Sequence, residues 1–297
     1  MSKFLDRLHA DRPLIYDGGF GSELFGRGIE LTNSTLANEE QPDAVVDIHK
    51  TYIAAGADLI GTNTFVASGL HLEMAGKNER DVAPIVVKAV ENARLAVKQS
   101  KKEIYIAGSI GPSPGAIETD SGDTVFGIAN DKARAAHEKM AKALADAGVD
   151  FFCVETQFSA NEAALIVDVL RQFNLPIAVN LTYKYTKDRN SGEIVYKTDW
   201  GHCPADLVEI LGAAAKFQGV AVGVADEDRC VAVAAKHDWA LGDLDVLCLE
   251  RRDGVLDGAD PQCHMGEAGI FDFLIHQDIA AAVGGGGVDD QIHLHVV

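Results

Sequence analysis

Short apolar runs alternate with segments of helical periodicity along the whole chain. The apolar runs predict strands at 14–16, 58–62, 104–109, 151–156, 177–182, 220–224, 245–249 and 279–283. The periodic segments predict helices at 42–54, 82–99, 131–147, 161–173, 205–216 and 227–236. Strands that alternate with helices, without a break in composition, are typical of parallel βα units.

Eight such units close naturally into a barrel. We therefore expect an α/β protein whose residues 1–297 form a single (β/α)8 TIM-barrel domain. The alternative is an open doubly wound sheet, although no Gly-x-Gly-x-x-Gly turn follows the first strand, which disfavours a dinucleotide-binding protein. After the fifth strand, alternating residues around Asn190-Ser191-Gly192 predict a hairpin, which is either a lid or a surface excursion.

Polar residues gather where five of the predicted strands end. In a barrel these ends share one rim, where active sites form. Each residue alone is also explained by a hydrogen bond within the chain, but five polar ends together favour a pocket, because buried polar groups need partners that a ligand can supply. The residues are Asp17-Gly18-Gly19, Thr62-Asn63-Thr64, Ser109, Glu155-Thr156 and Asn180-Leu181-Thr182.

The charge balance excludes some partners. Lys and Arg total 26 and Asp and Glu total 45, so the formal net charge is −19. A chain this acidic is a poor ligand for nucleic acid or an anionic membrane. No apolar run approaches the roughly 18 residues of a membrane span, and the N-terminus lacks the apolar core of a signal peptide. Five scattered cysteines do not suggest a disulfide framework. We expect a cytoplasmic protein that binds a small molecule.

Taken together, the strand-end motifs resemble the homocysteine S-methyltransferase family. That family includes betaine– and S-methylmethionine–homocysteine methyltransferases and the homocysteine domain of cobalamin-dependent methionine synthase. The resemblance covers about the first 175 residues and implies a (β/α)8 barrel in which Asp17 and Glu155 hold the amino group of homocysteine. The matching segments are 17–24, 26–28, His49, Tyr52, 55–60, 62–65, 107–112 and 155–156.

From this resemblance we predict a substrate site and leave the catalytic residues unassigned. The predicted substrate-binding residues are Asp17, Gly18, Gly19, Thr62, Asn63, Glu155 and Thr156.

The second half departs from the family at its zinc site. Family members bind zinc through three cysteines at the ends of the sixth and eighth strands, and the zinc presents a thiolate. Here Val222 stands at the sixth strand end and glycines 284–287 at the eighth. The remaining soft ligands lack the paired spacing of a structural zinc site, so we predict no metal site. These ligands are His202, Cys203, Cys263, His264, His293 and His295.

Three hypotheses follow. The first is a methyltransferase of this family that acts on a small amino-bearing or methylated substrate without a zinc-bound thiolate. The second is a non-catalytic small-molecule-binding relative, or a subunit that works with a corrinoid or other partner protein. The third is conventional zinc-dependent homocysteine methylation with relocated ligands. The short segment after Gly287 leaves little room for a final helix, which favours a homodimer over a monomer.

Overall fold

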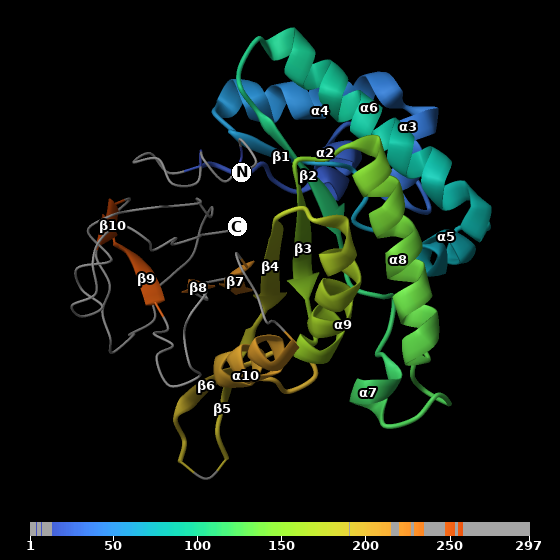
Figure 1. The fold of residues 1–297 in the computed structure, drawn as a ribbon. Helices are drawn as coiled ribbons and strands as arrows, with labels where there is room; N and C mark the ends of the chain where they lie inside the picture. Colours follow the sequence, from blue (N-terminus) through green and yellow to red (C-terminus); the bar gives the residue numbers. More distant parts are fainter. Residues whose placement is uncertain are drawn as a thin grey trace. The chain divides into compact units, whose positions relative to one another are not determined.

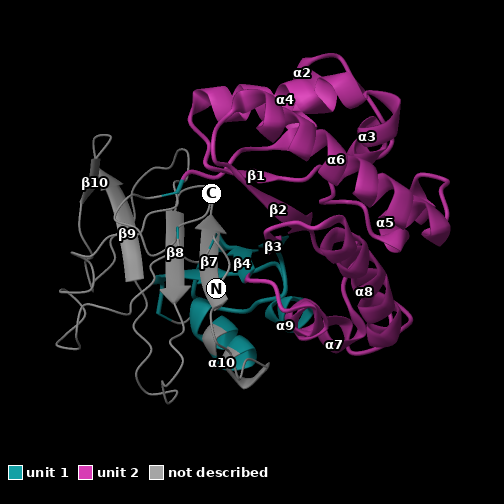
Figure 2. Ribbon diagram, turned by 45° about the horizontal axis from the view of Figure 1, so that its top comes forward, with its two compact units in different colours: residues 1–14, 156–164, 177–297 teal, residues 15–155, 165–176 magenta. Residues whose placement is uncertain are grey.

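The structure is a computed structural model that describes residues 14–189 and 191–214, Phe4 and Arg7, and the backbone of strands β7 to β10 (Figure 1). The chain divides into two compact units, shown in different colours in Figure 2. Unit 2 comprises residues 15–155 and 165–176, and unit 1 comprises residues 1–14, 156–164 and 177–297.

Unit 2 is built on parallel strands. These are β1 (Leu59–Gly61), β2 (Tyr105–Ile110) and β3 (Phe151–Gln157), whose last two residues belong to unit 1. Leu59 pairs with Tyr105, and Ala107 pairs with Phe151. At the predicted first strand, Tyr16 forms a parallel bridge with Leu59. The predicted strands at 58–62, 104–109 and 151–156 are confirmed, because apolar residues fill both faces of this covered sheet.

Long helices α4, α6 and α8 connect these strands and pack side by side along them (Figure 1). Helix α4 begins with Pro42, a favourable first residue, and ends at Gly56, whose φ of 119° few other residues adopt. Helices α4, α6 and α8 confirm the helices predicted at 42–54, 82–99 and 131–147, and the unit also contains short helices that were not predicted. The helices of unit 2 are α2 (Phe20–Gly26), η1 (Ser34–Leu36), α3 (Ala37–Glu40), α4 (Pro42–Ala55), α5 (Gly69–Met74), η2 (Glu79–Asp81), α6 (Val82–Ser100), α7 (Glu118–Ser121), α8 (Asn130–Ala147) and η3 (Arg171–Phe173).

Unit 1 contains one parallel strand pair and a run of antiparallel strands. Strand β4 (Ile177–Thr182) pairs in parallel with β7 (Val220–Asp226), with Val179 opposite Val222. Strands β8 (Arg229–Ala234), β9 (Leu247–Arg252) and β10 (Val255–Asp257) follow, each antiparallel to its predecessor. Helix α10 (Pro204–Ala214) lies in unit 1, and α9 (Ala160–Leu170) begins there.

The antiparallel strands differ from the expected all-parallel arrangement. The helix predicted at 227–236 is wrong, because β8 occupies residues 229–234. A short run of alternating valine and alanine fits either element, and β-branched residues favour the strand. The predicted strand at 245–249 exists as β9, but it runs antiparallel to its neighbour. The predicted strand at 279–283 and the glycines at 284–287 lie outside the described residues.

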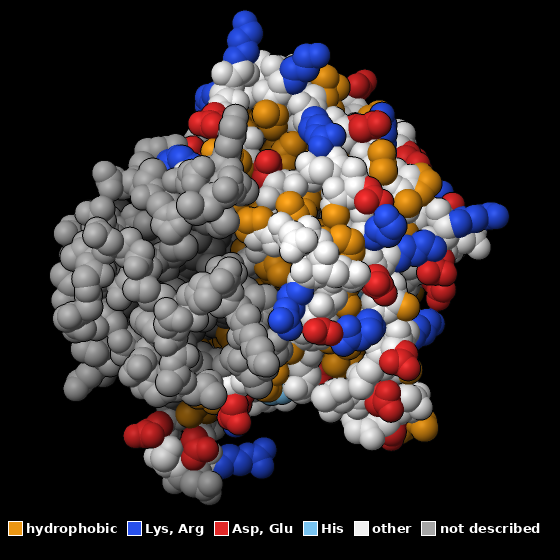
Figure 3. All heavy atoms as spheres, in the orientation of Figure 1, with side chains coloured by type: hydrophobic (Ala, Val, Ile, Leu, Met, Phe, Trp, Pro, Cys, Tyr) orange, Lys and Arg blue, Asp and Glu red, His pale blue; other side chains and the backbone are white. Residues whose placement is uncertain are grey.

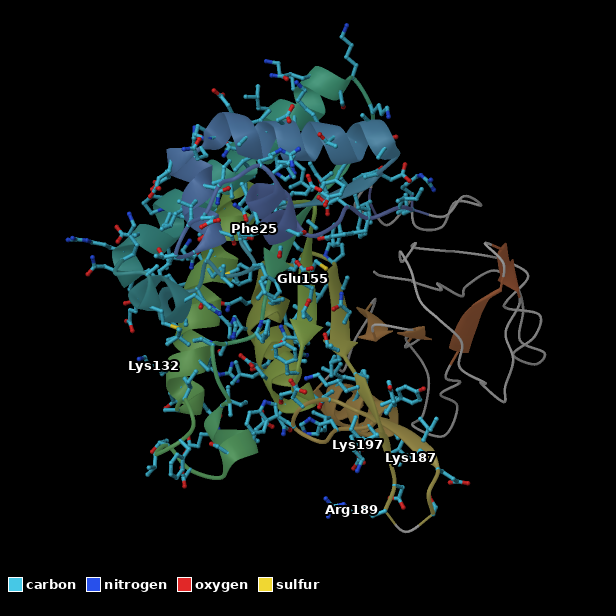
Figure 4. The ribbon with its side chains drawn as sticks, turned by 180° about the vertical axis from the view of Figure 1, so that it is seen from behind. Phe25, Lys132, Glu155, Lys187, Arg189 and Lys197 are labelled. Atoms are coloured by element: carbon cyan, nitrogen blue, oxygen red, sulfur yellow. The ribbon has the colours of Figure 1, made fainter. Side chains whose placement is uncertain are left out.

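The hairpin predicted after the fifth strand is confirmed. Strands β5 (Lys184–Lys187) and β6 (Ile194–Lys197) pair antiparallel, with Tyr185 opposite Tyr196. Figure 4 shows labelled cations from this hairpin, Lys187, Arg189 and Lys197. Elsewhere on the face shown in Figure 3, cationic and anionic side chains are interspersed, and none of the described helices is long and apolar enough to cross a bilayer.

Candidate substrate site

Asp17 lies directly after the Tyr16 bridge and is buried, with 6% of its surface exposed. Its backbone N–H donates to the Leu59 carbonyl at 3.0 Å, which continues the parallel pairing. Both of its carboxylate oxygens accept the Gly61 N–H, each at 3.0 Å. Gly61 has no room for a side chain, because a Cβ there would lie 2.8 Å from the Tyr16 hydroxyl. The end of β1 therefore holds the Asp17 carboxylate in a fixed position.

Burial raises the pKa of the Asp17 carboxyl well above its usual range. The hydrogen bond from Gly61 lowers this pKa, and the nearby charge of Glu155 raises it further. Since a buried carboxylate is costly without a positive partner, Asp17 tends either to keep a proton or to bind a cation.

Glu155 lies near the end of β3 in unit 2, is partly accessible to solvent, and is labelled in Figure 4. The Ser109 hydroxyl at the end of β2 donates a short hydrogen bond to Glu155 Oε1. Burial raises the pKa of the Glu155 carboxyl, and the hydrogen bond from Ser109 opposes this rise. Burial thus raises the pKa of both Asp17 and Glu155, and the two carboxyl groups lie close enough for the charge of Glu155 to act on Asp17.

The hydroxyls of Thr62 and Thr64 belong to the segment that follows β1, and both threonines are buried. Thr62 Oγ1 lies 2.7 Å from Thr64 Oγ1 and accepts the Ser109 N–H at 3.2 Å. Thr64 Oγ1 in turn donates to the Ser109 carbonyl at 2.7 Å. The Thr62 side chain is therefore connected to the β2 end, beside Glu155, through Ser109.

Hydrogen bonds with Ser34 and Asn38 hold Asn63 in place. Its Nδ2 donates to the Ser34 carbonyl at 2.9 Å, and its backbone carbonyl accepts from Asn38 Nδ2 at 2.8 Å. Asn38 is buried as well, and its backbone carbonyl accepts from Asn92 Nδ2 at 3.0 Å. These contacts connect the loop after β1 to α3 and α6.

Gly18 and Gly19 are exposed, and Gly18 lies against Tyr52 of α4, whereas Gly19 lies against the Ser22 hydroxyl. A Cβ on Gly18 would lie 2.9 Å from the Tyr52 hydroxyl, which donates to the Gly19 carbonyl at 3.2 Å. A tyrosine of the same chain thus lies close to the backbone of this glycine pair. Burial raises the pKa of Tyr52 to about 12, so its hydroxyl stays protonated and able to donate.

In unit 1, Thr156 has a φ of +57°, a conformation that is strained for a β-branched residue. The Asn180 side chain of β4 accepts the Thr156 N–H at 2.6 Å and so helps to hold it. Strain of this kind gathers at functional sites.

Ser109 and Asn180 hold predicted site residues but, like Thr64, are not themselves among the predicted substrate-binding residues. Both are polar residues at strand ends, and that position is the signal available in the sequence. Their particular role depends on hydrogen bonds to residues 46 and 24 positions away along the chain.

The histidine and cysteine of the 202–203 pair make local contacts within unit 1. His202 Nδ1 accepts the N–H of Ala160, the first residue of α9, at 3.2 Å, and the Cys203 N–H donates to Asp206 Oδ2 at 2.7 Å. Cys153 is buried in β3. Among the described residues, no three His, Cys, Asp or Glu side chains are arranged to hold a metal ion. The other proposed soft ligands, Cys263, His264, His293 and His295, lie outside those residues.

Parallel strands connected by helices, with buried polar groups at their carboxyl ends, define this chain as an α/β protein. The family model for homocysteine S-methyltransferase matches residues 14–224. The chain therefore belongs to the homocysteine S-methyltransferase family.

Two curated relatives illustrate this membership. The methionine synthase of Mycobacterium leprae is 28% identical over 249 residues, which are 77% of this chain and 19% of that protein. The homocysteine S-methyltransferase of Escherichia coli is 27% identical over 172 residues, 54% of this chain and 55% of that protein. The chain thus spans between about a fifth and just over half of these relatives.

The metallated form of the Escherichia coli homocysteine methyltransferase MmuM has a similar fold. The TM-score is 0.59 at 22% sequence identity, and the match covers 74% of this chain and 76% of that one.

Proposed function

We propose that this chain is a methyltransferase that binds a small amino-bearing substrate through Asp17 and Glu155. The observation that carries this proposal is the pair of carboxyl groups in unit 2, one buried and one partly accessible, whose pKa values are both raised. An ammonium group carries one positive charge, which would offset the charge of one ionised carboxylate and so recover part of the free energy lost on burial of the pair. Gly18, Gly19, Thr62, Asn63 and Thr156 complete the proposed substrate-binding set.

The proposed reaction does not use a zinc-bound thiolate. Val222 of β7 replaces one family cysteine, and a valine side chain cannot ligate zinc. We further propose that residues 1–297 form one domain of the TIM-barrel type, in which β8 to β10 depart from the all-parallel (β/α)8 pattern, and that the chain acts in the cytoplasm.

There are two other candidate functions, because the residues at the family's zinc-ligand positions are not the cysteines of the family pattern. One is a non-catalytic small-molecule-binding relative, or a subunit that works with a corrinoid or other partner protein. The other is a zinc enzyme with relocated ligands. Similarity to a methionine synthase supports a subunit that works with a partner. A homodimer is proposed as the assembly.

The binding test compares L-homocysteine with 4-mercaptobutyrate, which lacks the amino group, by isothermal titration calorimetry. We expect the wild-type protein to bind the amine at least tenfold more tightly, and Asp17→Asn and Glu155→Gln to remove that preference. Asp150→Asn is the matched control. Its carboxylate also accepts a backbone N–H, from Ile106 at 2.7 Å, and burial also raises its pKa, but it lies at the opposite end of the strands.

The control variant should keep the wild-type preference. Equal binding of both compounds by the wild-type protein would refute the amino-group role.

Catalysis is tested by methionine formation from homocysteine with betaine, S-methylmethionine or methyltetrahydrofolate, together with metal analysis of the purified protein. Methyl transfer without bound zinc supports the proposal. Stoichiometric zinc with activity that a chelator removes supports relocated ligands, and binding without turnover supports a non-catalytic relative.

A further inference from the structure

We propose that Ser109 is a positioning residue that orients the Glu155 carboxylate for an ammonium ligand, and that the Thr62 and Thr64 hydroxyls hold Ser109 in place. This inference rests on the proposed function of Glu155. The four residues belong to unit 2 and come from the ends of three adjacent parallel strands. Ser109 is buried, with 3% of its surface exposed.

The direction of each hydrogen bond in this network follows from the number of protons available. Thr64 Oγ1 donates its single proton to the Ser109 carbonyl, at 2.7 Å. In the 2.7 Å contact between the two threonines, Thr62 must then be the donor. Thr62 Oγ1 keeps its lone pairs and uses one to accept the Ser109 N–H, at 3.2 Å.

Both backbone polar groups of Ser109 are therefore bound by threonine side chains. This arrangement fixes the Ser109 backbone and leaves its hydroxyl proton to be donated to Glu155 Oε1. A carboxylate with one oxygen bound in this way presents its other lone pairs in a defined direction. Orientation of a site residue by a hydrogen bond from a second residue is a common way to preorganise a binding site.

The Ser109 hydroxyl also favours the charged form of Glu155, because a hydrogen bond donated to a carboxylate stabilises it. Loss of the hydroxyl should make Glu155 keep its proton to higher pH. Binding of an ammonium ligand then weakens most at low pH and recovers as the pH rises. The other ionisable groups facing this site, Asp17, Tyr16 and Cys153, are the same in the variants.

The experiment measures the Kd for L-homocysteine between pH 6 and pH 9 in wild-type, Ser109→Ala and Ser109→Thr proteins. We expect Ser109→Ala to raise the Kd at pH 7 by about ten- to a hundredfold, which corresponds to the loss of a hydrogen bond to a charged group. The difference should narrow at pH 9. Ser109→Thr keeps the hydroxyl and should restore binding and its pH profile.

Ser113→Ala is the control, because Ser113 is a buried serine from the same segment whose hydroxyl lies 3.3 Å from His137 Nε2. It should leave the pH profile unchanged. An equal loss at all pH values in Ser109→Ala, or a Kd within twofold of the wild-type value, would overturn the positioning role.

A second measurement does not depend on the ligand. Infrared difference titration follows the Glu155 carboxyl signal, which Glu155→Gln removes and thereby identifies. The midpoint should rise in Ser109→Ala and return in Ser109→Thr. If the wild-type protein binds no amine, the proposed function fails, and with it the positioning of Glu155 for an ammonium ligand; a shifted midpoint would then show only that Ser109 stabilises the Glu155 carboxylate. If the wild-type protein binds the amine but the midpoint does not shift, only the Ser109 role fails.

Discussion

His49 provides a quantitative prediction about acid stability. Its side chain is fully buried in α4, and its ring lies against Phe20 with the centroids 4.7 Å apart. Among the residues that the structure describes, neither ring nitrogen has a hydrogen-bond partner. Burial without a partner disfavours the imidazolium and lowers the pKa of His49 to about 3. The folded protein therefore keeps this histidine neutral over the range in which the unfolded chain protonates it.

The sign and size follow from the two pKa values. In the unfolded chain a histidine titrates near pH 6.5, so between pH 6.5 and pH 3 the unfolded state binds more protons and the folded state loses stability as the pH falls. Each pH unit in that window is worth about 1.4 kcal/mol. Between pH 7 and pH 5, His49 alone should lower the free energy of unfolding by about 2 kcal/mol.

The assay is urea unfolding at pH 7 and pH 5 of the wild-type protein and of His49→Leu. Any change in packing that the leucine causes alters the free energy of unfolding equally at both pH values. The loss between pH 7 and pH 5 should therefore be about 2 kcal/mol smaller in the variant. His71→Leu is the matched control, because His71 is partly exposed whereas His49 is fully buried. An equal pH dependence in His49→Leu and wild type would refute the assignment of a buried, neutral His49.

Three further predictions concern stability. Thr156→Gly should raise the free energy of unfolding by about 1 kcal/mol in urea titration, because glycine accepts the φ of +57° without strain; a clear loss would show that the threonine side chain stabilises the fold. Gly111→Ala should lower the free energy of unfolding by about 2 kcal/mol in the same assay, since a Cβ there would lie 2.5 Å from the Phe65 carbonyl. Its control is Gly21→Ala, which should not destabilise the protein, because no described atom lies within 4 Å of a Cβ at that position. Asp17→Asn should stabilise the ligand-free protein above about pH 4. The reason is that the raised pKa of Asp17 makes wild-type stability fall as the pH rises through that range. Thermal melts at pH 5 and pH 8 that show no difference between the variant and the wild type would contradict this.

Much of the fold follows from the sequence because buried parallel strands are continuously apolar and their helices have a helical period. The strand at 177–182 and the helix at 82–99 were predicted to within a residue at each end. Strand β8 was missed because a run of alternating valine and alanine has no period that distinguishes a short strand from a helix. Its antiparallel direction depends on pairing with β7, which no local pattern encodes.

The candidate site divides in the same way. The sequence by itself determined that Asp17, Thr62, Ser109 and Glu155 stand at strand ends, because a polar residue that closes an apolar run is visible locally. Only the tertiary structure decided how each polar atom is bound. Hydrogen bonds connect Thr62 to Ser109 and Ser109 to Glu155, and the Asn63 side-chain amide donates to the Ser34 carbonyl. The physical reason is that these hydrogen bonds join residues 29 to 47 positions apart, so the strand register, and not the local sequence, selects the partners.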